Sequence, residues 1–511
     1  MLLALVVHRF FFRMTSIPQS FAHHIRSARK RSKICALRVA RIISVRTEIQ
    51  LALTQDLCAI IHATRYDSLG DECVQRVKQA IKDGIAVALA GAHEPPVQIM
   101  TQHMLALGGS PQASIWGTGT KLSVVQAAYV NSVATHVLDF EPMWSPPTHS
   151  VSPTVPVAFA LAEVHRLSGR QIITAVAKGL EIQGRLQYAG NQYVPEELKF
   201  HPPGVAGVIG SAVVAADLLE LDALTMRHAI GLAASRAGTL LANIGSMTKS
   251  THCGNAAASG LDAALLAQRG FTANPDVLEA HKGLIPTFYP DRFDADRLLA
   301  YGKPYRVVDP GLAIKLFPSQ YATHYGITAG LELHRALGKR NKTIRRVRMF
   351  SPVMKYIDRP QPATGLDGKF SFQYTAAAAL LDGAVKIDSF TEERRLRSDM
   401  VEMLKKIELA QEISISGDFH SMHVEVQVEL EDGTTHTAVC RGPRGSWGVP
   451  MEDEDHQAKL RDCLEHALPK SEGEALLEQL NRLDQLDARA MEPLLSLMST
   501  TTRSPSLAAR G

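Results

Sequence analysis

The chain has 511 residues, of which 45% are hydrophobic and 21% are charged, a composition typical of globular proteins and unlike that of disordered or collagen-like chains. This length exceeds what a single hydrophobic core usually serves, so we expect two domains. No apolar run approaches the roughly 18 residues that span a bilayer, so we expect a soluble protein with no membrane partner.

The formal net charge of +4 hides an uneven distribution. Residues 1–47 hold ten Lys or Arg and no acidic residue, so the remainder carries 4 − 10 = −6. A mildly acidic body gives no sign of a nucleic-acid partner. The basic leader resembles a mitochondrial transit peptide, which would place the protein in the mitochondrial matrix. The alternative is a mispredicted start, with Met14 or a later residue as the true beginning, and a cytoplasmic protein.

The six cysteines are widely scattered and form no C-x-x-C pair. They therefore predict neither a disulfide framework nor a zinc or iron–sulfur site, and they point to a reducing compartment. The six are Cys35, Cys58, Cys73, Cys253, Cys440 and Cys463.

Apolar residues at helical spacing dominate residues 48–302, which we predict to be the first part of a large helical domain. Their faces are rich in Ala, Gly and Val, as in residues 205–216, so the central helices should approach closely and be buried on most sides. The predicted helices cover residues 50–63, 71–90, 122–138, 155–167, 172–186, 203–219, 223–241 and 255–268.

Strand-like pieces appear in residues 303–443, which predict a smaller α+β domain. The strongest signal is the alternation at 423–430 followed by Glu431, Asp432 and Gly433, which is typical of a hairpin. Residues 444–498 return to a helical pattern and should pack on the first domain, whereas residues 499–511 are expected to be disordered. The other predicted strands are 305–308, 344–350 and 412–415, and the predicted helices are 320–337, 372–381, 392–405, 455–468 and 472–483.

Five polar stretches lie between apolar elements and carry the ionisable groups. The main one runs from His136 to His149, where Pro142, Pro146 and Pro147 end a buried helix near Asp139, and Ser150 or Ser152 could cap the next. The others are residues 200–204, 247–255, 315–320 and 356–360. No nucleophile elbow, phosphate loop or dinucleotide fingerprint is present. The inventory therefore indicates acid–base chemistry on an anionic substrate, without a metal or other cofactor.

Each candidate also has a plain structural explanation. His149 could simply cap a helix, Asp139 could be a helix-end carboxylate, and His201 before two prolines is as well explained by structure as by function. Lys249 could be a solvated surface lysine, and the neighbouring His252 is weaker still. Lys315 is different, because it lies in an apolar run where an unpaired ammonium would be costly to bury, which favours a functional or ion-paired role.

These stretches, together with residues 370–374, resemble the MmgE/PrpD family, in order and over about residues 48–498. The family contains 2-methylcitrate dehydratases and cis-aconitate decarboxylases. The resemblance implies a large helical domain, a smaller α+β lid, a homodimer and a metal-independent site in the cleft between domains. It matches Asp139, His149, His201, Lys249, Lys315 and Tyr356 to the family's site residues.

Two positions depart from the decarboxylase pattern: Met143 replaces a threonine, and Gln320 replaces a histidine. An apolar side chain at the first position and the absence of a proton carrier at the second suit a branched citrate better than cis-aconitate. We therefore expect a dehydratase of 2-methylcitrate or a longer alkylcitrate, with cis-aconitate decarboxylation to itaconate as the alternative and an inactive tricarboxylate-binding protein as a third possibility.

The expected roles follow from the chemistry of dehydration. Lys249, Lys315 and Arg359 would hold substrate carboxylates, and His149 would transfer the proton while Asp139 orients it. His201 and Tyr356 would assist at the leaving hydroxyl. Met143, Gln320 and His252 complete the predicted binding set.

Overall fold

The computed structural model describes residues 52–290 and 292–501. Residues 54–511 form one compact unit, and residues 1–53 are assigned to another. The predicted leader lies outside the described residues, as does the predicted tail beyond Thr501. The start of that tail is ordered, because Ser499 ends a helix and its carbonyl accepts a 2.9 Å hydrogen bond from the Gly119 N–H. None of the described helices is both long and apolar enough to cross a membrane.

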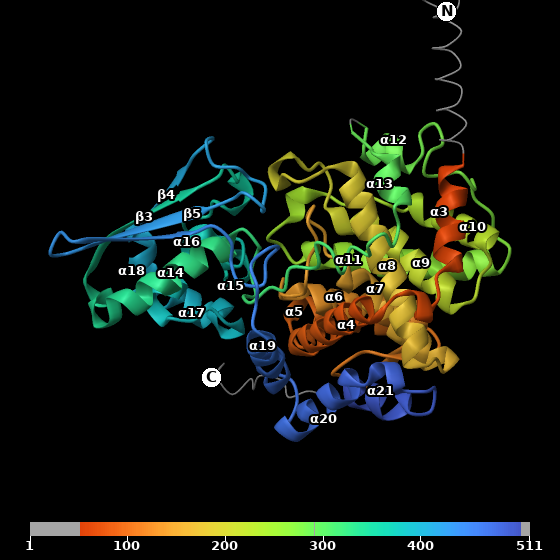
Figure 1. Ribbon diagram of the computed structural model, residues 1–511. Helices are drawn as coiled ribbons and strands as arrows, with labels where there is room; N and C mark the ends of the chain where they lie inside the picture. Colours follow the sequence, from red (N-terminus) through yellow and green to blue (C-terminus); the bar gives the residue numbers. More distant parts are fainter. Residues whose placement is uncertain (1–51, 291, 502–511) are drawn as a thin grey trace, which may run out of the picture. The chain divides into compact units, whose positions relative to one another are not determined.

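The larger part of the unit is helical, as predicted (Figure 1). Most predicted helices are found within a few residues of their expected bounds, and α5, α12 and α13 were not predicted. A short antiparallel pair, β1 (Ala113–Ser114) and β2 (Lys121–Leu122), precedes α6. The helices are α3 (Leu53–Ala63), α4 (Asp71–Gly91), α5 (Pro95–Leu107), α6 (Val124–Val137), α7 (Val151–His165), α8 (Gly169–Gly190), α9 (Ala206–Leu218), α10 (Ala223–Ala234), α11 (Thr248–Gln268), α12 (Leu284–Phe288) and α13 (Ala295–Leu299).

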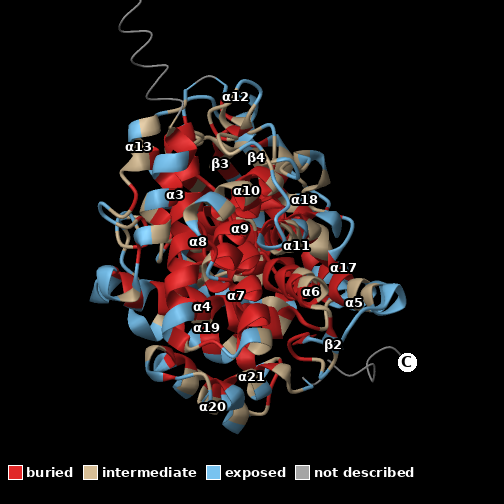
Figure 2. Ribbon diagram, turned by 90° about the vertical axis from the view of Figure 1, so that its right-hand side faces the viewer, coloured by how far each residue is buried: buried red, intermediate tan, exposed pale blue. Residues whose placement is uncertain are grey.

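Small residues set the spacing of the central helices. A Cβ atom added to Gly260 of α11 would lie 2.3 Å from Ser211 Cβ of α9, and one added to Gly179 of α8 would lie 2.4 Å from a methyl group of Val214, also in α9. Helices α7, α8, α9 and α11 are accordingly buried along most of their length (Figure 2). The close approach predicted from the Ala, Gly and Val content is confirmed.

The smaller part is a four-stranded sheet with helices against it. The strand order is β4-β3-β5-β6, with β3 parallel to β4 and the other pairs antiparallel. Helices α14, α16 and α18 lie along the same side of the strands (Figure 1). The elements are α14 (Thr323–Leu337), β3 (Ile344–Ser351), α15 (Gly365–Gly368), α16 (Phe372–Asp382), α17 (Glu392–Leu396), α18 (Ser398–Lys406), β4 (Ile407–Gln411), β5 (Val424–Leu430) and β6 (Thr435–Cys440).

The hairpin prediction is confirmed, because β5 is buried at every second residue and turns into β6 through Gly433, whose φ is +81°. Three other expectations were wrong. Residues 305–308, predicted as a strand, form a turn between Pro304 and Pro310. The strand predicted at 412–415 lies earlier in the chain, where β4 ends at Gln411. The helix predicted at 392–405 breaks at Arg397, whose backbone is extended.

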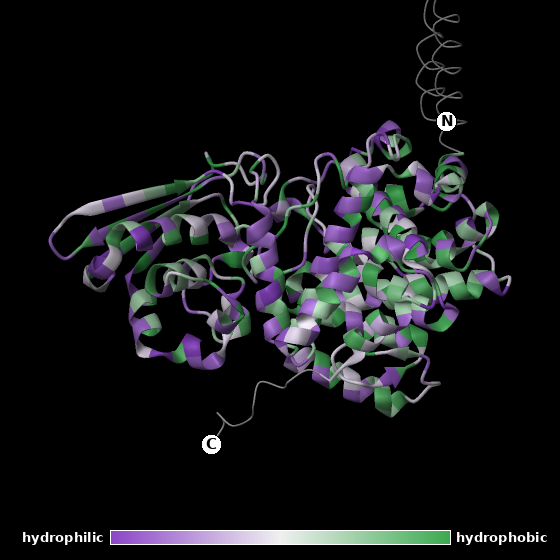
Figure 3. Ribbon diagram, turned by 60° about the horizontal axis from the view of Figure 1, so that its bottom comes forward, coloured by the Kyte–Doolittle hydropathy of each residue, from purple (hydrophilic) through white to green (hydrophobic). Residues whose placement is uncertain are grey.

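Three C-terminal helices follow the sheet: α19 (Asp453–Glu465), α20 (Lys470–Asn481) and α21 (Met491–Ser499). Helices α19 and α20 contact α4, and Lys459 of α19 forms a buried ion pair with Asp83 of α4. Hydrophobic and hydrophilic segments alternate along the outer helices (Figure 3), as expected for helices with one solvated face. Helices α19 and α20 thus pack on a helix more than 360 positions earlier in the chain.

Candidate active site

The loop between α6 and α7 presents Asp139 and Glu141 from a buried position. Helix α6 ends at Val137, and Asp139 adopts φ +51°, a left-handed conformation that aspartate tolerates better than most residues. Helix α7 begins at Val151, four residues earlier than predicted, because Pro153 falls in its first turn, where no backbone donor is needed. Ser150 occupies the N-cap position, but its hydroxyl makes no capping bond.

Two lysines from distant segments meet at Asp139. Lys249 Nζ lies 2.8 Å from one carboxylate oxygen, and Lys315 Nζ contacts the other and lies 2.9 Å from the Asp139 carbonyl. Helix α11 begins at Thr248, earlier than predicted, so Lys249 is in its first turn and only 6% exposed. Burial alone would raise the pKa of Asp139, but the two ammonium groups outweigh it and hold this pKa well below its usual range.

The Glu141 carboxylate lies between the rings of His136 and His149. Its Oε1 contacts His136 Nδ1 and lies 3.3 Å from His149 Nδ1. Ser152, the other predicted cap, is inside α7 and donates its hydroxyl proton to Glu141. Burial lowers the pKa of His136 to about 4 despite Glu141, and it also lowers the pKa of His149. Burial therefore favours the neutral form of both rings, and Glu141 opposes it.

His201 and His252 form a second, contacting pair. Their Nδ1 atoms are 3.0 Å apart, and the His201 ring centroid lies 6.1 Å from that of His149. Burial, together with Lys249 and the other histidines, lowers the pKa of both. His201 faces the cavity, whereas His252 stands behind it.

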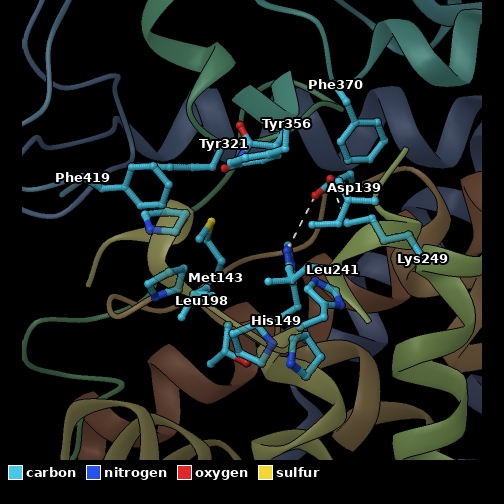
Figure 4. A pocket seen from close by; sticks show the side chains of 18 of the residues that line it. Asp139, Met143, His149, Leu198, Leu241, Lys249, Tyr321, Tyr356, Phe370 and Phe419 are labelled. Carbon is cyan, nitrogen blue, oxygen red and sulfur yellow. Dashed lines mark hydrogen bonds and ion pairs between the residues drawn. The ribbon is translucent and has the colours of Figure 1, made fainter. Parts of the chain in front are cut away.

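A cavity of about 230 Å³ opens onto these groups. Its polar lining includes Asp139, His149, His201, Lys249 and Lys315. Figure 4 shows Tyr321, Tyr356, Phe370 and Phe419 along one side and His149, Leu198 and Leu241 along the other. One end of the cavity therefore carries two ammonium groups that share the Asp139 carboxylate, and most of the remaining wall is apolar, with Glu196 as a further carboxylate.

The two unusual residues both line this cavity. The Gln320 amide donates to the Tyr356 hydroxyl at 2.9 Å, and burial raises the pKa of Tyr356. Met143 is held by two backbone hydrogen bonds with Ala313, of 3.0 and 2.9 Å, so its side chain has a fixed place in the wall.

Eight of the ten predicted site residues line the cavity, and Arg359 and His252 do not. Arg359 bonds to Asp367 and donates to the Ile244 and Tyr356 carbonyls at 3.0 Å each. The prediction that it holds a substrate carboxylate is therefore corrected, because Arg359 does not line the cavity and its guanidinium is held by these three contacts. The surface alternative for Lys249 is also wrong.

Sequence reasoning missed His136, Glu141, Lys369 and Lys459 as functional candidates. His136 and Glu141 both lie in the singled-out stretch 136–149 but were given no role. Lys369 and Lys459 stand in ordinary helical or turn sequence, and nothing local marks them.

Some of these side chains have the spacing of a metal site. Donor atoms of His136, His149 and His201 lie within 4.8 Å of one another. However, Lys249 Nζ is 3.0 Å from His136 Nε2, so a cation bound there would meet an ammonium at close range. This donor set fits a metal poorly and an anionic substrate well.

Comparisons with known proteins agree with this geometry. The MmgE/PrpD N-terminal domain matches residues 55–295, and the MmgE/PrpD C-terminal domain matches residues 317–485. Cis-aconitate decarboxylase of Mus musculus is 30% identical over 447 residues, covering 85% of this chain and 91% of that protein. The Homo sapiens enzyme is 30% identical over 465 residues, covering 89% and 95%. Cis-aconitate decarboxylase of Aspergillus terreus is 26% identical over 482 residues, covering 89% and 97%. With both domains matched across most of its length, the chain belongs to the MmgE/PrpD family.

Proposed function

We propose that this protein is a carboxy-lyase that decarboxylates cis-aconitate or a closely related unsaturated tricarboxylate. The relatives compared above are named cis-aconitate decarboxylases, which favours the alternative over the dehydratase that we expected first. The observation that carries the proposal is the pairing of Lys249 and Lys315 at Asp139, at one end of a largely apolar cavity.

Decarboxylation needs positively charged groups near the carboxylates that are kept and an apolar environment around the carboxylate that leaves. In cis-aconitate, the bond to the carboxylate on the CH₂ carbon breaks and its electron pair forms a new double bond to the central carbon. The old double bond then takes a proton at its far carbon, which gives itaconate and carbon dioxide. Among the described residues, the Lys249 ammonium hydrogen-bonds only to His136 and Asp139, so it keeps one N–H free of these partners and binds a carboxylate that is kept. The three N–H groups of Lys315 are taken by Asp139 and the Ser319 carbonyl, so Lys315 holds Asp139 and adds positive charge to the site. An apolar wall formed by Met143, Leu198 and Phe419 destabilises the departing carboxylate relative to neutral carbon dioxide.

His149 is the proposed proton donor. Its ring lines the cavity and lies beside Glu141, so protonation creates an ion pair within hydrogen-bonding reach. A bound tricarboxylate adds negative charge near the ring and favours the protonated form. Asp139, 3.8 Å from His149 Nε2, orients the ring and balances the lysines.

Purified protein is to be incubated separately with cis-aconitate, 2-methylcitrate and citrate. Released carbon dioxide and the products identified by mass spectrometry are followed over time. We expect carbon dioxide and itaconate from cis-aconitate, and a His149→Gln variant should form neither. Dehydration of a citrate without carbon dioxide release would refute the proposal.

A 2-alkylcitrate dehydratase is the second candidate. Met143 lines the cavity together with Leu198 and Leu241, and this surface fits an alkyl branch better than a hydroxyl or carboxylate. In that reaction Tyr356, held by Gln320, stands as the acid for the leaving hydroxyl. The same assay separates the two reactions, because dehydration forms a new double bond without releasing carbon dioxide.

A further inference from the structure

Three consecutive backbone carbonyls in the Asp139 loop each accept a hydrogen bond from a different buried lysine. Lys369 Nζ lies 3.5 Å from the Leu138 oxygen, Lys315 Nζ lies 2.9 Å from the Asp139 oxygen, and Lys459 Nζ lies 2.8 Å from the Phe140 oxygen. The three lysines come from three separate parts of the chain and are at most 5% exposed. Lys315 already belongs to the site, whereas Lys369 and Lys459 do not line the cavity.

The loop needs such partners because of where it lies. It follows the C-terminus of α6, where carbonyls lack helical partners and the helix dipole favours cations. Asp139 also leaves the right-handed region there, with φ +51°. Since the surrounding residues are buried, water has little access to the carbonyls. The ammonium groups satisfy them and stabilise an unusual backbone conformation.

Lys369 connects this loop to the one that carries Lys315. Its Nζ also donates to the Pro318 carbonyl at 3.1 Å, and its own carbonyl accepts from the Gln320 N–H at 2.9 Å. It forms no ion pair with any carboxylate of the described residues, and burial lowers its pKa to about 8. Its polar partners are thus backbone carbonyls of two loops that carry site residues, and its Nζ also lies 4.4 Å from the centre of the Phe390 ring.

Lys459 fixes the other side of the loop. Its Nζ lies 2.9 and 2.7 Å from the two carboxylate oxygens of Asp83, and 4.2 Å from the centre of the Phe140 ring. His456 Nε2 lies 3.0 Å from the same carboxylate. Helices α4 and α19 are thereby joined to the residue between Asp139 and Glu141.

We propose that Lys369 and Lys459 are positioning residues that hold the Asp139 backbone in its left-handed conformation and so aim its carboxylate between Lys249 and Lys315. This inference rests on the proposed function in one respect, because it takes Asp139 to be part of the active site. Neither lysine needs to touch the substrate.

The test compares Lys369→Met and Lys459→Met with a matched control, Lys178→Met. Lys178 is 1% exposed and pairs with Asp217 in the helical part, outside the cavity. We expect kcat on cis-aconitate to fall by about 10- to 100-fold in the two loop variants, because small displacements of reacting groups cost that much. KM should change by less than about threefold, and the control should keep its kcat per folded molecule. Lys369→Arg, which keeps the charge and donors, should recover much of the rate.

Crystal structures of the folded variants give a readout that does not depend on the reaction. We expect Asp139 to leave positive φ, or its carboxylate to lose Lys249, in Lys369→Met and Lys459→Met but not in Lys178→Met. An unchanged Asp139 in both loop variants would overturn the inference, as would a wild-type kcat. A third outcome also overturns the inference. If Lys178→Met folds but Lys369→Met, Lys459→Met, Lys369→Arg and Lys459→Gln all fail to fold, the two lysines serve the stability of the fold. An inactive wild type would refute the proposed function alone, because the Asp139 geometry would still be measured.

Discussion

Lys249 Nζ and Asp139 Oδ2 lie 2.8 Å apart although 110 positions separate the two residues in the chain. Both side chains are less than a tenth exposed. Removing either partner leaves a buried charge without its neighbour, which is more costly than losing an exposed pair. This pair therefore links the stability of the fold to the electrostatics of the site.

Lys249→Met should destabilise the protein by about 1.5–3 kcal/mol, the value of a buried hydrogen bond to a charged group, because Asp139 keeps Lys315 as its charged partner. Chemical denaturation monitored by circular dichroism measures the change. Arg236→Met is the matched control: Arg236 pairs with Asp262, with both side chains at least a third exposed, so its loss should cost less than about 1 kcal/mol. Equal losses in the free energy of unfolding for Lys249→Met and Arg236→Met would show that burial does not make the Lys249–Asp139 pair more important for stability than an exposed pair.

Tricarballylate, a saturated tricarboxylate that cannot react, should stabilise the wild type. At about 100 times its Kd the gain should be about 2.7 kcal/mol, growing with concentration. Lys315→Ala should abolish the stabilisation, because it removes one of the two positive charges that balance Asp139, a carboxylate in the cavity wall that would then repel the anion. Thermal unfolding with and without the ligand measures it, and an inactive binding protein would show the same shift without turnover. A stabilisation that survives Lys315→Ala would place the anion elsewhere.

The activity should rise as the pH falls through neutrality. Burial lowers the pKa of His149 below its ordinary 6.5, and kcat/KM reports the ionisation of the free enzyme. With protonated His149 as the donor, kcat/KM increases as the pH falls and reaches its plateau only below pH 6.5. Glu141→Gln removes the carboxylate that favours protonation, so its inflection should move to lower pH. A kcat/KM that increases with pH across this range would exclude the assigned role.

Stability should fall on mild acidification because of His324. This ring is 1% exposed, and burial lowers its pKa to about 3. Since an unfolded histidine titrates near 6.5, the unfolded state binds a proton that the folded state does not between these two values. Stability is therefore complete above about pH 6.5 and is lost as the pH falls toward 3.

His324→Gln should reduce this pH slope by about 1 kcal/mol per unit. Denaturant titrations between pH 7 and pH 5 measure the slope. His165 is exposed at the end of α7, so His165→Gln is the control and should leave the slope unchanged. A slope that is the same in His324→Gln and the wild type would contradict the assignment.

Met143→Thr should shift the substrate preference toward unbranched acids. A threonine hydroxyl in the cavity wall binds polar groups and removes apolar surface, and one methylene-sized contact is worth about 10- to 200-fold in specificity. Competition between cis-aconitate and an alkyl-substituted analogue measures the ratio. Gln320→Asn, which draws the amide back by one methylene but leaves Met143 in place, should change this ratio much less.

Much of this architecture could be predicted from local pattern alone. Helical periodicity located most helices of the larger part, and the alternation at 424–430 with Gly433 located the hairpin. Apolar surroundings around Lys315 predicted that it would be ion-paired, and it is. Such features are local because periodicity and turn chemistry depend on a few neighbouring residues.

Only the tertiary structure decided which partner each buried charged side chain has. The sequence left Lys249 open as a surface residue, gave Arg359 a substrate role, and did not mark Lys369 or Lys459. Each outcome depends on a partner more than a hundred positions away or on a neighbouring loop: Asp139 for Lys249, Asp367 for Arg359, and the Leu138 and Phe140 carbonyls for the two lysines. A side chain's ionisation and role are set by the field of its spatial neighbours, and folding alone brings those neighbours together.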